Sequence, residues 1–121
     1  MIKSVFLVIS IFYSSVLFAQ KDIKLEEASK YVGDSVQVCG KIYSTRFFVN
    51  AQDAPTLLNI GAAYPDQLLT IVIYGNVRKE FTEAPETYYK DKIVCVTGKV
   101  SLYKEKPQII IYSKKQVIVK D

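Results

Sequence analysis

The clearest pattern in the chain is an alternation of apolar and polar residues that begins at Ser35. Four residues face one way, Val36, Val38, Gly40 and Ile42, and three face the other, Gln37, Cys39 and Lys41. A period of two is typical of a half-buried strand, so the pattern predicts one strand from Ser35 to about Phe48. A glycine within such a strand often marks a bulge or sharp bend.

Other segments show the same kind of pattern. We expect strands over 57–60, 68–75, 92–103 and 108–119, with loops over 50–56 and 61–67 and a hairpin turn over 104–107. Helical spacing predicts a turn or more of helix over 23–32, which Gly33 ends. Helical turns are also expected over 77–81, and Pro85 excludes one continuous helix from 76 to 90.

One motif occurs twice. The sequence YVGDSVQVCGKI (31–42) is matched by YKDKIVCVTGKV (89–100), with Gly40 in the position of Gly98. Two neighbouring strands that must curve to close a barrel would each need an apolar inner face and a glycine at the bend. With helical residues between the third and fourth strands, the order predicts an all-β fold with short helical segments: a five-stranded, Greek-key OB-fold barrel.

Three segments resemble successive blocks of a family of small bacterial OB-fold domains that are exported. They are EASKYVGDSVQVCGKI, TLLNIGAAYPDQLLTIVIYG and VTGKVSLYKEKPQIII, and the resemblance covers most of residues 25–113. The resemblance implies the OB fold and an exported location. It implies nucleic-acid binding only as a general property of OB domains. Glu105 stands where the family more usually has a glycine between two lysines, which predicts a different hairpin tip.

The N-terminus predicts the compartment. Lys3 is followed by the uncharged segment 4–19, mostly apolar, which ends at Ala19, as in a secretory signal peptide. The alternative is an uncleaved anchor, for which the segment is shorter than the roughly 20 residues required. We therefore expect a signal peptide over 1–19, a single OB-fold domain over 20–121, a periplasmic or secreted location, and no membrane anchor after cleavage. Removing Lys3 lowers the net charge from +4 to +3, which is only mildly basic.

The chain has two cysteines, Cys39 and Cys95. An even number in an exported chain suggests a disulfide. If Gly40 and Gly98 are equivalent bends, both sulfurs lie outside the barrel on neighbouring antiparallel strands, within reach of each other. Two separate thiols remain the alternative, because this argument does not fix the register.

Candidate catalytic chemistry is sparse. The chain contains no histidine, which excludes Ser–His, Cys–His and His–metal sites. The carboxylate pairs Glu26/Glu27 and Glu83/Glu86 lie beside lysines and are interpreted as solvated surface charge. We therefore expect a non-catalytic protein without a cofactor or metal.

Basic and aromatic residues occur together in the two loops through which OB domains bind ligands. Single-stranded nucleic acid needs basic groups for phosphates and rings for base stacking. The candidate contacts are Arg46, Phe47 or Phe48, Tyr74, Lys104 and Lys106. The expected activity is weak, sequence-tolerant binding of single-stranded nucleic acid. The alternative is a cell-envelope module for an oligosaccharide, a peptide or a protein partner, for which Asn50, Gln52, Asp53 and Asn59 are equally suitable.

Overall fold

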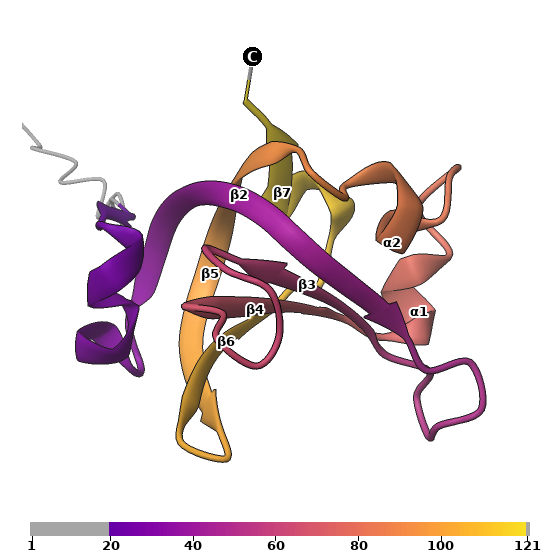
Figure 1. Cartoon of the computed structure of the whole chain (residues 1–121), viewed down its shortest axis with the longest axis horizontal. Coiled ribbons are helices and arrows are strands. Elements are labelled where there is room, and N and C mark those ends of the chain that lie inside the picture. Colours follow the sequence, from indigo (N-terminus) through magenta and orange to yellow (C-terminus); the bar gives the residue numbers. More distant parts are fainter. Residues whose placement is uncertain (1–19, 121) are drawn as a thin grey trace, which may run out of the picture.

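A computed structural model describes residues 20–120. The expected signal peptide over 1–19 lies outside the described residues. In chain order the elements are β1 (Lys21–Asp22), η1 (Leu25–Tyr31), β2 (Ser35–Phe47), β3 (Thr56–Ile60), β4 (Leu69–Ile73), α1 (Gly75–Arg78), α2 (Pro85–Tyr88), β5 (Ile93–Tyr103), β6 (Lys106–Ile110), η2 (Lys114–Gln116) and β7 (Val117–Val119). The fold is therefore mostly β with a few short helices (Figure 1).

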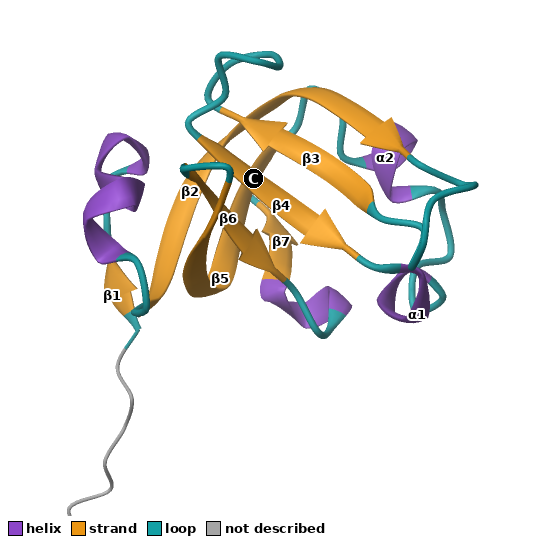
Figure 2. Ribbon diagram, turned by 90° about the horizontal axis from the view of Figure 1, so that it is seen from below, coloured by secondary structure: helices purple, strands orange, loops and turns teal. Residues whose placement is uncertain are grey.

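The sheet closes because its two longest strands each pair twice. Residues 35–41 of β2 pair with 93–99 of β5, and residues 42–47 of β2 continue along β3. The sheet order is β1-β2-β3-β4-β6-β5-β7, and the additional β2–β5 pairing joins β2, β3, β4, β6 and β5 into a ring. Figure 2 shows β3, β4 and β6 between the two curved strands. The ring is consistent with the expected OB barrel.

The expected count of five strands is wrong, because the sheet has seven. β1 pairs with β2, and β7 pairs with β5, at the two edges. The single strand expected over 108–119 is also wrong: it is interrupted by η2. Ser113 caps this turn, with its side chain accepting from the Lys115 amide, while the Gln116 side chain accepts from the Ser113 amide. This reciprocal arrangement is a capping box, which favours a helical turn where the strand would otherwise continue.

The two helical segments after β4 lie where the sequence predicts helical turns, with shifted bounds. Pro85 is the first residue of α2 rather than only a break, a position where proline's missing amide hydrogen costs nothing. The core is formed by the inner faces of the strands. Val36, Val38, Val94 and Val96 are at most 1% exposed, as the alternation predicts.

Gly40 and Gly98 lie at the points where β2 and β5 change partners. A Cβ on Gly40 would lie 2.5 Å from Cγ2 of Ile60, and a Cβ on Gly98 would lie 2.6 Å from Cγ2 of Ile109. The glycines therefore allow the neighbouring strands to pack closely at the bend, which explains why both copies of the motif contain one.

The two copies of the motif are related by a local two-fold axis. Val38 and Val96 are equivalent in the two copies, and they lie opposite each other. The residue equivalent to Cys39 is Thr97, whose partner across the strands is Gln37. Two cysteines at equivalent positions would thus not face each other, and this explains why the copies carry them at different places.

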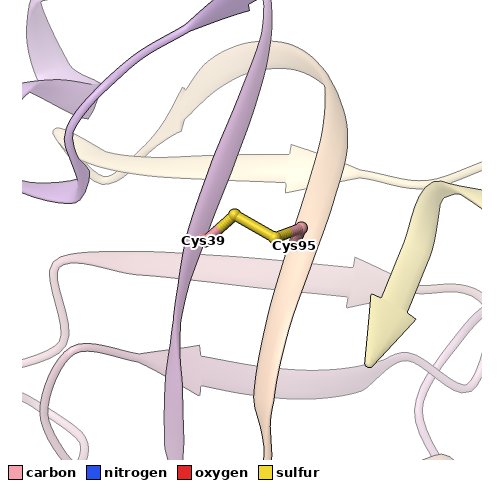
Figure 3. The surroundings of a disulfide bond; sticks show 2 residues. All are labelled: Cys39 and Cys95. Carbon is pink, nitrogen blue, oxygen red and sulfur yellow. A yellow bond between two sulfur atoms is a disulfide. The ribbon is translucent and has the colours of Figure 1, made fainter. Parts of the chain in front are cut away.

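Cys39 lies opposite Cys95, and the two form a disulfide (Figure 3). Both residues are half-buried, on the outer face of their strands. The predicted bond and its location outside the barrel are confirmed, and the alternative of two separate thiols is excluded.

Candidate functional site

A row of uncharged polar side chains crosses the outer face of the barrel. The register places its five members side by side on successive strands, in the order Ser44, Asn59, Thr70, Gln108 and Ser101. We call this set the outer polar row. Asn59 donates to Ser44 Oγ at 3.0 Å, and Thr70 donates to Asn59 Oδ1 at 3.0 Å. At the other end, Gln108 donates to Ser101 Oγ at 3.3 Å.

The loop between β3 and β4, residues 61–68, borders this row. The Tyr64 amide donates to Ser44 Oγ, and Gln67 Nε2 donates to Thr70 Oγ1. Asn59 is 3% and Thr70 is 9% exposed. Gln67 Oε1 is buried without a hydrogen-bond partner among the described residues. The middle of the row is thus buried beside this loop, and Ser44, Gln108 and Ser101 are its partly exposed members.

Arg46 lies two residues beyond Ser44 along β2 and is exposed. Its guanidinium lies over the ring of Phe48, 4.5 Å from the centroid. No described residue forms a salt bridge or side-chain hydrogen bond with Arg46. We call Arg46 and Phe48 the free pair, since the cation is exposed and the ring is only half-buried.

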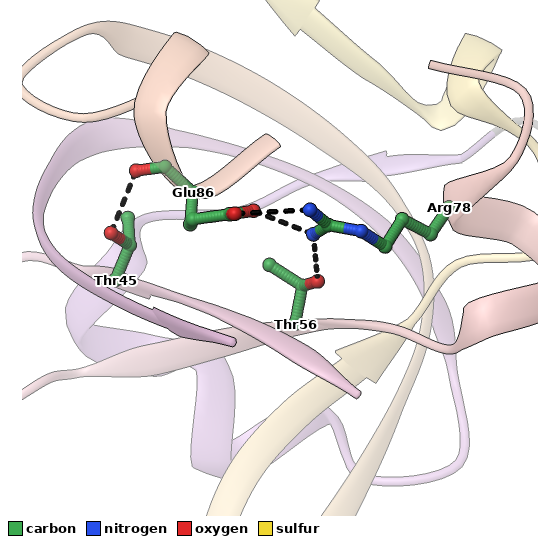
Figure 4. A network of polar contacts seen from close by, with 4 residues as sticks. All are labelled: Thr45, Thr56, Arg78 and Glu86. Carbon is green, nitrogen blue, oxygen red and sulfur yellow. Dashed lines mark hydrogen bonds and ion pairs between the residues drawn. The ribbon is translucent and has the colours of Figure 1, made fainter. Parts of the chain in front are cut away.

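Phe47 is held by other residues. Arg78 of α1 lies over its ring, 3.6 Å from the centroid. The same guanidinium donates two hydrogen bonds to Glu86 of α2, at 2.5 and 3.0 Å, and one to Thr56 Oγ1 at 2.7 Å (Figure 4). Thr45 of β2 donates to the backbone carbonyl of Glu86. We call Arg78 and Phe47 the held pair.

The interpretation of Glu86 as solvated surface charge is wrong. Its side chain is 23% exposed and is paired bidentately with Arg78. These hydrogen bonds stabilise the charged form and lower the pKa of the Glu86 carboxyl, although partial burial opposes the shift. The network ties both short helices to β2 and β3, so its role is to fix the fold beside the site.

Tyr74 lies at the end of β4, immediately before α1, and is half-buried. It lines a shallow hollow with Ala51, Ala54 and Tyr112. The Gly75 amide donates to the Asp53 carbonyl at 2.7 Å, which ties this corner to the loop after β2. Tyr74 therefore lies beside that loop.

The two lysines of the β5–β6 hairpin differ in the same way as the two phenylalanines. Lys104 is exposed, 5.4 Å from the centroid of the Tyr103 ring. Lys106 donates to the Pro65 carbonyl and lies 5.9 Å from the centroid of Tyr64. The hairpin, at the bottom of the view in Figure 1, lies well apart from the loop after β2, at the lower right. The structure thus separates the predicted residues into two clusters, with the outer polar row between them.

Sequence reasoning missed the outer polar row because successive members are 7 to 31 residues apart along the chain, and only the register brings them together. The available signal was one small uncharged polar residue at an outward position in each strand. Asn59, named with three loop residues as a sugar-binding set, belongs to this row instead. Asn50, Gln52 and Asp53 are exposed in the loop after β2.

The sequence matches no family model and no curated protein. Solved structures do share the fold. The yeast Stn1 and Ten1 structure matches with a TM-score of 0.57 and 9% identity, over 93% of this chain and 66% of that chain. A lipoprotein of Klebsiella pneumoniae, named as nucleic acid-binding, matches with a TM-score of 0.50 and 16% identity, over 78% of this chain and 76% of that one.

A third structure, of a Leishmania major protein named as an aspartyl-tRNA synthetase, matches with a TM-score of 0.53 and 12% identity. The alignment covers 88% of this chain but only 22% of the synthetase chain. At these identities the likeness is one of fold alone. Within 20–120, no helix is long and apolar enough to cross a membrane.

Proposed function

We propose that this chain is an exported, non-catalytic module that binds single-stranded nucleic acid weakly and with little sequence preference, across its outer polar row. The observation that carries the proposal is the placement of a cation–ring pair with an exposed cation beyond each end of that row. Arg46 and Phe48 follow Ser44 along β2, and Tyr103 and Lys104 follow Ser101 along β5.

The chemistry of the three parts suits a single strand. The exposed Tyr103 ring and the half-buried Phe48 ring offer stacking surfaces, which every base can use because every base has a π-face. The cations offer phosphate contacts, which position a strand without reading its sequence. The partly exposed members of the row between them, Ser44, Gln108 and Ser101, can hydrogen-bond to base edges and sugars without repelling phosphates.

The fold comparisons support this proposal indirectly, since one match is named as nucleic acid-binding. Export is supported by the Cys39–Cys95 disulfide, because such bonds persist mainly in oxidising compartments. The apolar segment before residue 20 supports it as well.

The test is a titration of labelled oligonucleotides by fluorescence anisotropy at low salt. Binding is expected with a Kd of roughly 10⁻⁴ to 10⁻⁶ M, weakening steeply as salt rises because counterions are released. Arg46→Ala and Lys104→Ala should each weaken it, whereas Lys30→Ala, which removes an exposed lysine of η1, should not.

Absence of binding at about 10⁻⁴ M protein would overturn the proposal and favour an envelope module for a sugar, peptide or protein. Binding of a neutral oligosaccharide without salt dependence would favour that reading directly.

A further inference from the structure

Three lysines lie on adjoining backbone segments where β2, the start of β5 and the residue after β7 meet. Lys41 of β2 lies opposite Ile93 of β5. On the other side of Ile93, the Lys120 amide donates to the Ile93 carbonyl at 2.8 Å. Lys92 precedes Ile93, and its carbonyl accepts from the Ile42 amide at 3.0 Å. Ile93 is 50% exposed among them.

Two aromatic rings accompany these lysines. Lys41 Nζ lies 4.9 Å from the centroid of Tyr43, and Lys92 Nζ lies 3.4 Å from the centroid of Tyr88. Tyr43 is 44% and Tyr88 is 38% exposed. The arrangement repeats the chemistry of the free pair, with each ring open enough to stack and a cation beside it.

A groove connects this surface with the loop that borders the outer polar row. Lys41, Tyr43 and Lys120 line it, and it reaches that loop at Gly61 and Leu68. The Cys39–Cys95 disulfide also lines the groove. Tyr43 directly precedes Ser44, the first member of the outer polar row. The two surfaces are therefore continuous along β2.

Acidic groups limit the region that an anion could occupy. Asp22 and Glu26 line the same groove from the N-terminal segment, and Asp91 precedes Lys92. Lys24 also lines the groove. Four lysines against these three carboxylates would leave only a small net attraction if the whole surface were filled. Tyr43 lies beside Lys41 in the groove, and Tyr88 and Lys92 lie outside its lining, where the Lys92 carbonyl accepts from the Ile42 amide. This arrangement favours a path along β2 toward the start of β5.

We propose that Lys41, Tyr43, Tyr88, Lys92 and Lys120 form a second subsite, which extends the path of a bound single strand beyond the outer polar row. This inference rests on the proposed function and adds to it a longer ligand. The lysines would contact phosphates, and Tyr43 would stack on a base next to the one at Ser44. The disulfide holds β2 and β5 together beneath the subsite, so the lysines on the two strands keep their spacing.

The experiment compares homopolymeric oligonucleotides of about 5 and about 16 nucleotides, the lower and upper range of OB-domain site sizes. A longer strand also offers more binding registers, which raises affinity without changing the salt slope. The slope of log K against log salt is therefore the deciding measurement. Three added phosphate contacts should steepen it by about 2 for the longer strand.

Raising the salt from about 50 to about 200 mM should then weaken the longer strand about 20-fold more than the shorter one. The triple variant Lys41→Gln, Lys92→Gln, Lys120→Gln should remove this difference and leave the shorter strand unaffected. Tyr43→Ala should weaken only the longer strand, by roughly five-fold or more. The matched control, Lys30→Gln, Lys114→Gln, Lys115→Gln, removes equal charge from exposed positions outside both surfaces.

Equal slopes for the two lengths, or equal effects of the two triple variants, would overturn the second subsite while leaving the proposed function intact. Failure of both strands to bind would overturn the proposed function and the subsite with it.

Discussion

Phe47 and Phe48 are neighbours in the sequence, and each has an arginine over its ring, yet they occupy different environments. The arginine over Phe47 is Arg78, which is anchored by Glu86 and Thr56. The arginine over Phe48 is Arg46, which is exposed and has no such anchor among the described residues. The same cation–ring contact is therefore part of the fold in one case and available to a ligand in the other.

The other partners of each cation therefore decide its role. A guanidinium whose donors are already used by a carboxylate and a hydroxyl has little left for a phosphate. One that contacts only a ring keeps its donors. Lys106, which donates to the Pro65 carbonyl, and Lys104, which does not, repeat this distinction on the hairpin.

The largest expected effect comes from the disulfide, which fixes the strand that carries both phenylalanines. The bond closes a loop with a sequence separation of 56 residues. On the chain-entropy estimate, the double variant Cys39→Ser, Cys95→Ser should lower the free energy of unfolding by about 4 kcal/mol. Urea denaturation measures the loss.

Reduction of the wild-type protein should reproduce that loss, and the reductant should not change the double variant. Two titratable thiols in the denatured, unreduced wild-type protein would contradict the bond.

A substitution in the held pair should lower the stability of the fold much more than the same substitution in the free pair. Arg78→Ala removes the partner of Glu86 and a donor to the fully buried Thr56. We expect it to lower the free energy of unfolding by about 2–3 kcal/mol, somewhat less than for a fully buried pair. Arg46→Ala, the matched control, should change it by about 0.5 kcal/mol or less. Similar urea midpoints for the two variants would remove the distinction between the pairs.

Oligonucleotide binding should depend more on the free pair than on the held pair. Phe48→Ala should weaken oligonucleotide binding by about 1–3 kcal/mol, the range for one stacked base. Phe47→Ala should chiefly destabilise the fold, because Arg78 occupies one face of that ring. Anisotropy titrations at a temperature where both variants are folded make the comparison. Loss of binding in Phe47→Ala alone would assign the stacking role to the held ring.

β2 and β5 could be predicted because each alternates apolar and polar residues over at least four positions, and β4 because it is rich in β-branched residues. The two edge strands could not, since β1 has two residues and β7 three, too few for a period to appear. Their pairing depends on β2 and β5, which are distant in sequence. The interruption before β7 was predictable in principle from the capping-box spacing of Ser113 and Gln116.

The candidate site could be predicted only in part. The sequence indicates which loops carry basic and aromatic residues. It does not indicate that Arg78 reaches Phe47 from 31 positions away (78 − 47), because that contact requires α1 to lie against the end of β2. The outer polar row depends on the register of five strands, which no single strand specifies.

A smaller effect should appear in the pH dependence of the held pair. Hydrogen bonds from Arg78 lower the pKa of Glu86 in the folded protein. The stabilisation from this carboxylate is therefore present above the unfolded pKa, about 4.3, and is lost as the pH falls through the lower folded pKa. The stability difference between the wild type and Glu86→Gln should be largest above about pH 5 and shrink on acidification below about pH 4.

Urea midpoints across this range test the expectation. Glu83→Gln removes an exposed carboxylate from the same segment and serves as the control. A wild-type advantage over Glu86→Gln that stays constant from neutral pH to about pH 3 would show that the charge of Glu86 does not hold the pair.

The smallest expected effect concerns the hairpin that carries the other free cation. Lys104 and Glu105 both have left-handed backbone conformations, with φ of 49° and 68°. A two-residue hairpin of this kind favours glycine, because a side chain at positive φ is strained. Glu105→Gly should therefore raise the free energy of unfolding by about 0.5–1 kcal/mol. It also removes a carboxylate beside Lys104, so oligonucleotide binding should be equal or slightly tighter.

The matched control is Glu105→Gln, which removes the same charge and keeps the strain. It should reproduce the binding result without the gain in stability, and equal gains in the two variants would contradict the assignment to backbone strain.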